Sequence, residues 1–403
     1  MKRCSRAGAI VVVVALALSA FAADKGPIKV GFETPLVGVW AQNGRDMNNG
    51  FRMAMEESGY KAGGRQITVI TEDTEGKPEV GLVKTRKLVE SDKVDIIGGI
   101  LNTAVSLAIR DYVIAKKVPV VMTISAGVDL TGKLKTPWMF RASFANGQQD
   151  VVAGWYAYNK LGYKRMIIIS PDAIAGHEKA DGFIKTFKAS GGQIVDEIYP
   201  PPNTSDFGPY LSKIQANAKQ VDAVWMFFFG TGAIRLVQQW DEYGLKKQIP
   251  AFVIGDTVDD SYLPALKEAA VGIKNYSHYS DTLDLPENRR FADAYLAKYK
   301  EYPSLYAEAA YDTAKVILLA IDAVKGDVEN KEALLAAMRK VRFNAPRGPF
   351  RFDATQNAII SVYLRDVRKV GNRYANVVLE KIADDVDQNW TPAKLPKAAT
   401  TKK

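Results

Sequence analysis

The stretch Ile28-Lys29-Val30-Gly31-Phe32 opens an alternation of apolar, β-branched runs with amphipathic segments, and this alternation decides the fold class. Runs of this kind are typical of parallel strands that are buried on both faces of their sheet. Six more follow, at residues 67–71, 96–99, 118–123, 166–170, 223–229 and 251–255. Segments long enough for crossover helices lie between them, at residues 44–58, 79–91, 105–115, 147–160, 177–190, 208–218 and 232–243. The sequence therefore predicts an α/β protein with doubly wound sheets.

The alternation occurs twice, which indicates two Rossmann-like lobes. A chain of about 380 residues without its N-terminal segment also exceeds the size at which one core keeps growing. After the second series come helices at residues 287–299, 306–324 and 331–340 and a β-rich end at 348–382. We expect a first lobe from residues 28–142 and 278–347, a second lobe from 143–277 and 348–385, and a flexible basic tail at 386–403. The chain then crosses near Ser143, Ser277 and Pro349, and three crossings form a hinge.

The N-terminal segment predicts export. Lys2, Arg3 and Arg6 precede an apolar run at residues 7–18, and the small residues Ala20 and Ala22 follow it, which is the pattern of a signal peptide cleaved after Ala22. The run is too short to span a bilayer, so we expect a periplasmic protein. Cys4, the only cysteine, leaves with this segment. The mature chain is therefore expected to contain no disulfide, no thiol nucleophile and no cysteine-ligated metal.

Composition and motifs argue against several function classes. Removal of residues 1–22 takes away three positive charges and no acidic ones, which lowers the formal net charge from +9 to +6, and the remaining basic residues form no arm for nucleic acid. The sequence has no glycine-rich phosphate loop, no nucleophile elbow and no histidine pair with metal-ligand spacing. We expect no catalysis, no cofactor and no metal. The rival interpretations are an α/β enzyme and a module that senses a ligand for a receptor or regulator.

Several stretches together resemble a known family. They include residues 28–38, 49–50 and 67–73, then 98–103 and 120–127, and later 206–211, 222–224 and 306–312. In order and spacing they are similar to the leucine/isoleucine/valine-binding family of ABC-transporter solute-binding proteins, along essentially the whole mature chain. The resemblance implies the type I periplasmic binding protein fold, whose lobes close on one small solute. It also implies a membrane permease as the partner, and we expect the carrier to be a monomer.

The ends of two first-lobe strands supply the first candidate ligand contacts. Ligands of open α/β sheets bind beyond the carboxyl ends of the strands, near helix N-termini whose free amides suit a carboxylate. The strands at 96–99 and 118–123 are followed by Asn102 and Thr103 and by Ser125, Ala126 and Gly127. We expect hydrogen bonds to the ligand from the side chains of the first pair and from backbone amides of the second turn. Asn102 and Ser125 can alternatively cap their own helices.

Further candidates come from the loops that face the cleft. Trp40 lies in a polar, glycine-rich loop, where ligand stacking or lobe closure competes with ordinary packing, and Asn43 stands where the family carries an aromatic residue. Strand alternation sends Phe228 to one face and its two phenylalanine neighbours to the other, and Phe229, at the strand end, is expected in the cleft. Asp256 stands where the family carries an acid for the ligand's ammonium group, although it also suits a turn.

The loop at residues 173–177 bears on ligand size. Small residues replace a loop in which many relatives place a tyrosine over the ligand. Together with the aromatic candidates and with His177 and Tyr279, this replacement points to a ligand bulkier than leucine, such as the aromatic acids that some members of the family bind. His177 can instead lie in solvent at a helix start. The expected ligand is a small carboxylate, either a branched-chain or other amino acid or an aromatic acid.

Overall fold

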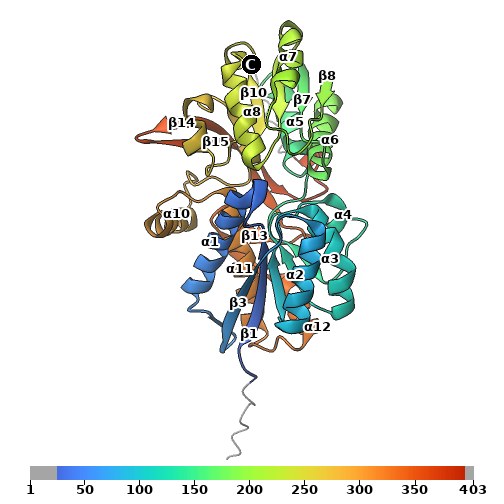
Figure 1. The fold of residues 1–403 in the computed structure, drawn as a ribbon, viewed down its shortest axis with the longest axis vertical. Helices are drawn as coiled ribbons and strands as arrows, with labels where there is room; N and C mark the ends of the chain where they lie inside the picture. Colours follow the sequence, from blue (N-terminus) through green and yellow to red (C-terminus); the bar gives the residue numbers. More distant parts are fainter. Residues whose placement is uncertain (1–24, 395–403) are drawn as a thin grey trace, which may run out of the picture.

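The computed structural model describes residues 25–394 and shows two α/β lobes stacked along the long axis of the molecule (Figure 1). The first lobe, lower in Figure 1, contains a six-stranded sheet with the strand order β2-β3-β1-β4-β5-β6. The second lobe contains a seven-stranded sheet with the order β15-β14-β11-β10-β9-β7-β8. The predicted fold class is confirmed. The predicted signal peptide, its cleavage site and Cys4 lie outside the described residues.

The first sheet is a parallel sheet buried on both faces. Its central strand β1 (Ile28–Thr34) is buried at every position except Lys29, and it pairs in parallel with β3 and β4. Apolar side chains from the two faces of the sheet belong to separate core clusters, as a doubly wound sheet requires. The other elements of this part are η1 (Gly38–Trp40), α1 (Ala41–Glu57), β2 (Lys61–Ala62), β3 (Arg65–Asp73), α2 (Pro78–Arg86), β4 (Ile96–Gly99), α3 (Thr103–Lys116), β5 (Val120–Met122), α4 (Val128–Thr131) and β6 (Met139–Arg141).

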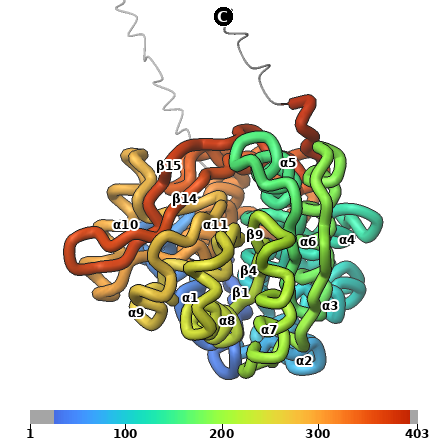
Figure 2. Tube along the Cα trace, turned by 90° about the horizontal axis from the view of Figure 1, so that it is seen from above, coloured from blue at the N-terminus to red at the C-terminus, as the bar shows by residue number. Residues whose placement is uncertain are grey.

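The second lobe repeats the strand-helix alternation and ends in an antiparallel hairpin. Its alternating part comprises α5 (Asp150–Asn159), β7 (Arg165–Ile169), α6 (Ile174–Ala189), β8 (Gln193–Ile198), α7 (Gly208–Ala216), β9 (Ala223–Met226), α8 (Gly230–Glu242), β10 (Ala251–Ile254), η5 (Gly255–Val258), α9 (Leu263–Leu266) and β11 (Lys274–Ser277). The hairpin consists of β14 (Ile360–Val370) and β15 (Arg373–Val386), and β14 pairs antiparallel with β11. Its tip projects from the side of the molecule, at the left of Figures 1 and 2.

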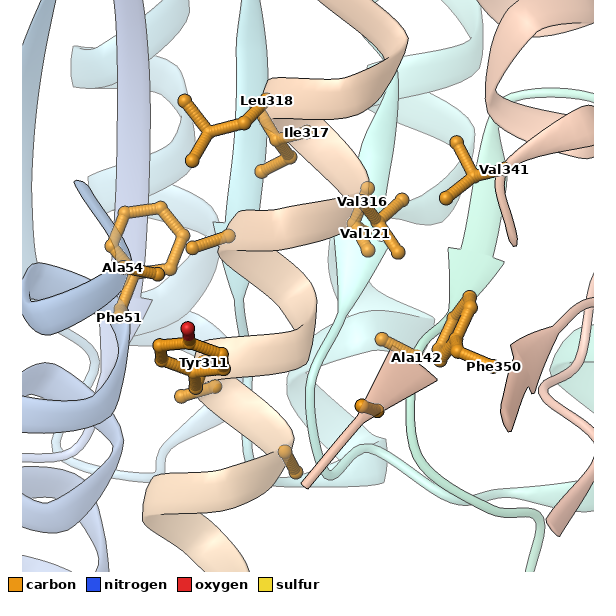
Figure 3. Close-up of a cluster of buried hydrophobic side chains, with 14 of the residues drawn as sticks. Phe51, Ala54, Val121, Ala142, Tyr311, Val316, Ile317, Leu318, Val341 and Phe350 are labelled. Atoms are coloured by element: carbon orange, nitrogen blue, oxygen red, sulfur yellow. The ribbon is translucent and has the colours of Figure 1, made fainter. Parts of the chain in front are cut away.

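The chain returns to the first lobe between β11 and β14. The returning elements are α10 (Pro286–Tyr299), α11 (Leu305–Ala323), α12 (Lys331–Lys340), β12 (Arg342–Ala345) and β13 (Gly348–Arg351). Helix α11 lies so close to α1 that a Cβ atom on Gly50 would stand 1.9 Å from the carbonyl oxygen of Ala307. Figure 3 shows side chains of α11 meeting Phe51 and Ala54 of α1 and Val121 of β5 in one core. Helix α11 is therefore a central element of the first lobe.

Three connections join the lobes, and the third lies later in the chain than expected. The first two follow β6 and β11, next to Ser143 and Ser277. The side chains of Phe350, Phe352 and Ala358 pack in the first-lobe core, whereas Ile360 packs in the second. The hairpin of β12 and β13 holds the chain on the first lobe, so the third connection lies at residues 358–360 and not near Pro349.

The expectation of a flexible tail from residue 386 is wrong for its first part. Trp390 is 4% exposed and packs in the second-lobe core. Gln388 donates a hydrogen bond to the carbonyl oxygen of Val128 in the first lobe, at 3.3 Å. Apolar burial of the tryptophan ring fixes this segment, which the charge pattern alone did not reveal. Residues 395–403 lie outside the described part of the chain. Between residues 25 and 394, no helix is both long and apolar enough to cross a membrane.

Candidate functional site

A cavity of about 310 Å³ lies between the two lobes. Its volume falls at the lower end of the range of small-ligand sites. The first lobe and the first connection contribute Trp40, Leu101, Asn102, Thr103, Ala104, Ile124, Ala126, Phe144, Asn146 and Tyr306. The second lobe contributes Ala173, Ile174, Ala175, Lys179, Pro202, Phe227, Phe229 and Asp256. The wall is thus mainly apolar and aromatic, with a few polar groups at defined places.

The N-terminus of α3 forms the first-lobe end of the cavity. Asn102 is the N-cap residue of this helix: its side-chain oxygen accepts a hydrogen bond from the amide of Ala104 at 2.9 Å. Its amide group donates to the carbonyl oxygen of Gly76 at 2.8 Å. Asn102 therefore caps its own helix, which was the alternative in the sequence analysis, and it also lines the cavity; a hydrogen bond from its side chain to a ligand stays a prediction. The Thr103 hydroxyl lines the cavity as well and accepts from the amide of Gly127 at 3.1 Å.

Of the three predicted residues in the turn after β5, Ala126 alone lines the cavity. Ile124, which precedes the turn, lines it as well. The expected amide donors of Ser125 and Gly127 are already used within the protein, because the Ser125 amide donates to the Ile100 carbonyl oxygen and the Gly127 amide to Thr103. The buried guanidinium of Arg141 donates to the carbonyl oxygens of both residues, at 3.0 and 2.5 Å. Burial lowers the pKa of Arg141 to about 9. Arg141 thereby fixes the turn and leaves neither residue in the cavity wall.

Trp40 and Asn43 have different positions, although both lie at the start of α1. The Trp40 ring lines the cavity and lies 5.3 Å, centroid to centroid, from the ring of Phe229 in the other lobe. Asn43 is fully buried outside the cavity, one helical turn further along, and its side-chain nitrogen donates to the Tyr262 hydroxyl of the second lobe at 2.5 Å. Asn43 therefore contacts the opposite lobe in place of the expected ligand contact.

The second lobe presents its loop after β7 and the end of β9. Residues 173–175 line the cavity, but His177 points away: its Nε2 lies 2.8 Å from an Asp172 carboxylate oxygen, and its ring stacks on Tyr199 with centroids 4.2 Å apart. With 47% of its side chain exposed, His177 matches the solvent alternative. Alternation past the end of β9 places Phe227 and Phe229 in the cavity and Phe228 in the core.

Tyr279 is also outside the cavity. Its side chain is fully buried in the first-lobe core, where its ring lies 6.4 Å from that of Phe291. Burial raises the pKa of Tyr279 well above its usual value. The sequence analysis grouped Tyr279 with the aromatic candidates for the cleft, but the chain has already entered the first-lobe core at this point.

Lys179 is a cavity residue that the sequence analysis missed. Its side chain is 3% exposed, and its Nζ lies 3.7 Å from a carboxylate oxygen of Asp256, which also lines the cavity. The same Nζ lies 4.6 Å from the ring centroid of Phe144 and 5.1 Å from that of Phe227. A helical period would have found it, because α6 buries Gly176, Lys179, Ala180 and Phe183 on one face.

The whole chain can now be compared with known proteins. The family model described as "periplasmic binding protein" matches residues 27–372. The chain belongs to this family. The expected resemblance to leucine/isoleucine/valine-binding proteins is thereby confirmed, since the "Leu/Ile/Val-binding protein homolog 6" of Brucella melitensis is 29% identical over 370 residues, which cover 90% of this chain and 93% of the relative.

Solved structures of transport proteins resemble this binding protein along almost their full length. An ABC transporter substrate-binding protein from Sphaerobacter thermophilus is 39% identical, with a TM-score of 0.85, and the match covers 90% of this chain and 99% of the other. A solute-binding protein of an ABC transporter from R. palustris, solved in complex with benzoate, is 31% identical with a TM-score of 0.85. That match covers 92% of this chain and 100% of the other. The protein is thus a solute-binding protein of the ABC-transporter type.

Behind the cavity, the binding protein holds a buried cluster of charged groups. Phe144 separates the two, because its ring lines the cavity and lies 5.0 Å from the ring of His278. Arg347 Nε lies 3.0 Å from an Asp312 carboxylate oxygen and 3.6 Å from one of Glu308. Burial raises the pKa of both carboxyl groups and lowers that of His278 well below its usual value. The cluster lies where the connections between the lobes meet.

The described residues, 25 to 394, contain no cluster of three or more histidine, cysteine or acidic side chains that could hold a metal ion. The two histidines lie in different parts of the binding protein, His177 in solvent and His278 in the buried cluster.

Proposed function

We propose that this protein is the solute-binding component of an ABC importer and that it captures an aromatic carboxylate between its lobes. The observation that carries the proposal is the cavity wall, where the rings of Trp40, Phe144, Phe227, Phe229 and Tyr306 surround a space of about 310 Å³. Aromatic side chains at such density suit a flat, apolar ligand body. The R. palustris relative in complex with benzoate supports this ligand class.

The carboxylate belongs at the α3 end of the cavity. Thr103 and Ala104 open this helix and line the cavity, and the amides at a helix start carry partial positive charge. The Thr103 hydroxyl accepts a hydrogen bond from Gly127, so its own proton is free for a ligand oxygen. One end of the cavity thus offers anion-binding groups, and the aromatic rings hold the rest of the ligand.

Transport follows from closure of the lobes over the ligand. The Trp40 and Phe229 rings come from opposite lobes, as do the hydrogen-bonded Asn43 and Tyr262. A ligand that contacts both lobes stabilises the closed form relative to the open one by its difference in affinity for the two. We expect the signal peptide to direct the chain to the periplasm, where the closed monomer delivers its ligand to a membrane permease.

A thermal-shift experiment on the mature chain tests the proposed ligand class. A ligand at about 100 times its dissociation constant adds roughly 2.7 kcal/mol to the free energy of unfolding. Benzoate and 4-hydroxybenzoate are expected to raise the melting temperature, and benzamide, with the same ring but no carboxylate, is the matched control. Leucine, isoleucine and valine are expected to give smaller shifts. A clear shift with the branched-chain amino acids and none with the aromatic acids contradicts the proposal.

A further inference from the structure

We infer that the cavity selects a ligand carrying a hydroxyl group at the end opposite its carboxylate, and that Lys179 and Asp256 together bind this hydroxyl. The inference rests on the proposed function and narrows it, from aromatic carboxylates in general to hydroxy-substituted ones. It depends on one pair of buried side chains that the second lobe contributes to the cavity wall, whereas the N-terminus of α3 belongs to the first lobe.

First, Lys179 lacks a hydrogen-bond acceptor within the described part of the protein. Lys179 Nζ is buried, and none of the residues from 25 to 394 accepts a hydrogen bond from it. Its distance of 3.7 Å from the Asp256 oxygen exceeds the length of a normal hydrogen bond. The rings of Phe144 and Phe227 stabilise the ammonium but accept no conventional hydrogen bond. A buried ammonium with three unused donors is costly, so the site requires an acceptor atom from the ligand.

The second step excludes charged ligand groups at this position. A ligand carboxylate that accepted from Lys179 would lie within a few ångströms of the Asp256 carboxylate, and two like charges at that distance disfavour each other. A ligand ammonium that paired with Asp256 would meet repulsion from Lys179, which the buried Asp150 carboxyl beside the pair offsets only in part. The sequence analysis assigned Asp256 to the ammonium of an amino acid. In the structure, Lys179 already provides the positive charge beside this acid.

The third step identifies the group that fits. A hydroxyl is neutral and is both a donor and an acceptor. Its oxygen accepts from Lys179 Nζ while its proton is donated to the Asp256 carboxylate, so one ligand group serves both partners. Lys179 and Asp256 belong to the second lobe, whereas Thr103 and Ala104 belong to the first. The two ends of the ligand are therefore held by different lobes, which links recognition of the hydroxyl to closure.

Two ligands of similar size test the inference on the unmodified protein. Isothermal titration calorimetry with 4-hydroxybenzoate and 4-methylbenzoate compares a hydroxyl with a methyl group at the same ring position. Sites built to bind a hydroxyl discriminate strongly against analogues without it, and we expect at least about a tenfold tighter dissociation constant for 4-hydroxybenzoate. Equal affinities, or tighter binding of 4-methylbenzoate, overturn the inference. This comparison needs no variant and so does not depend on a variant folding.

Variants test whether Lys179 and Asp256 cause the preference for 4-hydroxybenzoate. The double variant Lys179→Met, Asp256→Leu removes both charges and leaves neither partner alone, and we expect its preference for 4-hydroxybenzoate to fall to within about threefold. The single variant Lys179→Met is expected to gain binding of 4-(aminomethyl)benzoate, whose ammonium can then reach Asp256. Because a misfolded variant would not gain affinity for a new ligand, this result would also show that Lys179→Met is folded. Lys185→Met, at an exposed position of the same helix, is the matched control and should keep the wild-type pattern.

Failure of the inference and failure of the proposed function give different results. If the wild-type protein binds benzoate, 4-methylbenzoate and 4-hydroxybenzoate equally well, the ligand class stands and the role of Lys179 and Asp256 fails. If it binds none of them and binds leucine, the proposed function fails and the inference fails with it. A preference for 4-hydroxybenzoate that survives in the double variant also overturns the role of the pair.

Discussion

Asn102 caps α3 at the cavity wall, so under the proposed function helix capping and ligand binding depend on the same residue. Its side-chain oxygen caps α3 through the amide of Ala104, and its side-chain nitrogen holds the loop at Gly76. Both of its polar atoms are used by the backbone, so its contribution to binding is to set the direction of α3. Under the proposed function, the carboxylate of the ligand then lies at the positive end of that helix, beside the Thr103 hydroxyl, because the Ala104 amide is already bonded to Asn102.

Asn102→Asp separates these two roles. An aspartate is as good a helix cap as an asparagine, so the loss of the hydrogen bond to Gly76 should lower the free energy of unfolding by only about 1–2 kcal/mol. The added negative charge lies next to the proposed carboxylate position, and we expect the affinity for 4-hydroxybenzoate to fall at least about tenfold. Denaturant unfolding and calorimetry measure the two effects. A loss of stability without a loss of affinity contradicts the carboxylate position.

The structure places predicted residues in the cavity wall where the backbone position alone decides the outcome. Asn102 and Thr103 were found because the end of a parallel strand is a defined place, and Phe229 because alternation continues beyond the strand. The positions of Ser125 and Gly127 depend on Arg141, which packs onto their turn from a later strand. Lys179 was missed because a single lysine in a helix is usually exposed. The contact of Arg141 with this turn joins separate parts of the chain and is not specified by one sequence, whereas the helical period of α6 does indicate that Lys179 lies on a buried face.

At the scale of elements, the strongly apolar strands and the long helices were predicted close to their observed positions. The strand expected at 223–229 ends at Met226, because its last three residues turn toward the cavity and the core. Strands β2, β6, β8, β11 and β12 were missed. β6 is only three residues long, and β8 lies at the sheet edge with a half-polar sequence, so neither has the period of a typical strand.

The connecting elements depend on Arg347, which follows β12. Its guanidinium donates to the carbonyl oxygens of Ala142 and Ser143 in the first connection, at 2.6 and 3.3 Å. It also lies beside Asp312 and Glu308 on α11. One side chain thus ties the first connection and the β12-β13 hairpin to the central helix of the first lobe.

Arg347→Met is expected to destabilise the protein strongly. The substitution leaves Glu308 and Asp312 buried without their cation, which typically costs about 3–5 kcal/mol. Burial already raises the pKa of both carboxyl groups. Groups with a raised pKa in the folded state lose stability as the pH rises through that pKa, so the damage should be smaller at pH 5 than at pH 8.

Urea unfolding at both pH values measures this effect. Arg368→Met, which removes an arginine whose side chain is 51% exposed, is the control, and its effect should stay within about 0.5 kcal/mol. If the Arg347 variant is no less stable than this control, the cluster does not hold the connections.

At the scale of the whole molecule, repetition of the strand-helix pattern was enough to predict two lobes, but not how closely they approach. The two lobes contact each other where α8 meets η1 and α1, and helices α8 and α1 overlie each other in Figure 2. Gly230 begins α8 with a φ of +55°, and a Cβ atom there would stand 2.1 Å from the carbonyl oxygen of Val39 in the first lobe. The absence of a side chain at this glycine is therefore a condition for contact between the lobes.

Gly230→Ala is expected to weaken ligand binding more than it weakens the fold. The added methyl group collides with the opposite lobe as the lobes are arranged here, and separation of the lobes in the proposed open form removes this collision. We therefore expect a shift toward the open form and an apparent affinity for 4-hydroxybenzoate that is lower by at least about tenfold. Gly244→Ala is the matched control, because Gly244 has a φ of +71° and no atom closer than 3.8 Å to the added Cβ. Both substitutions carry the backbone strain of an alanine at positive φ, roughly 1 kcal/mol.

Similar losses of melting temperature are therefore expected for the two alanine variants, with a loss of affinity only for Gly230→Ala. Calorimetry gives the affinity, and small-angle X-ray scattering with ligand present compares the dimensions of the lobes. The Gly230 variant should remain more extended than the Gly244 variant at equal ligand concentration, since its closed form is sterically opposed. If both variants bind the ligand equally well and give the same scattering, the contact between Val39 and Gly230 does not limit closure of the lobes.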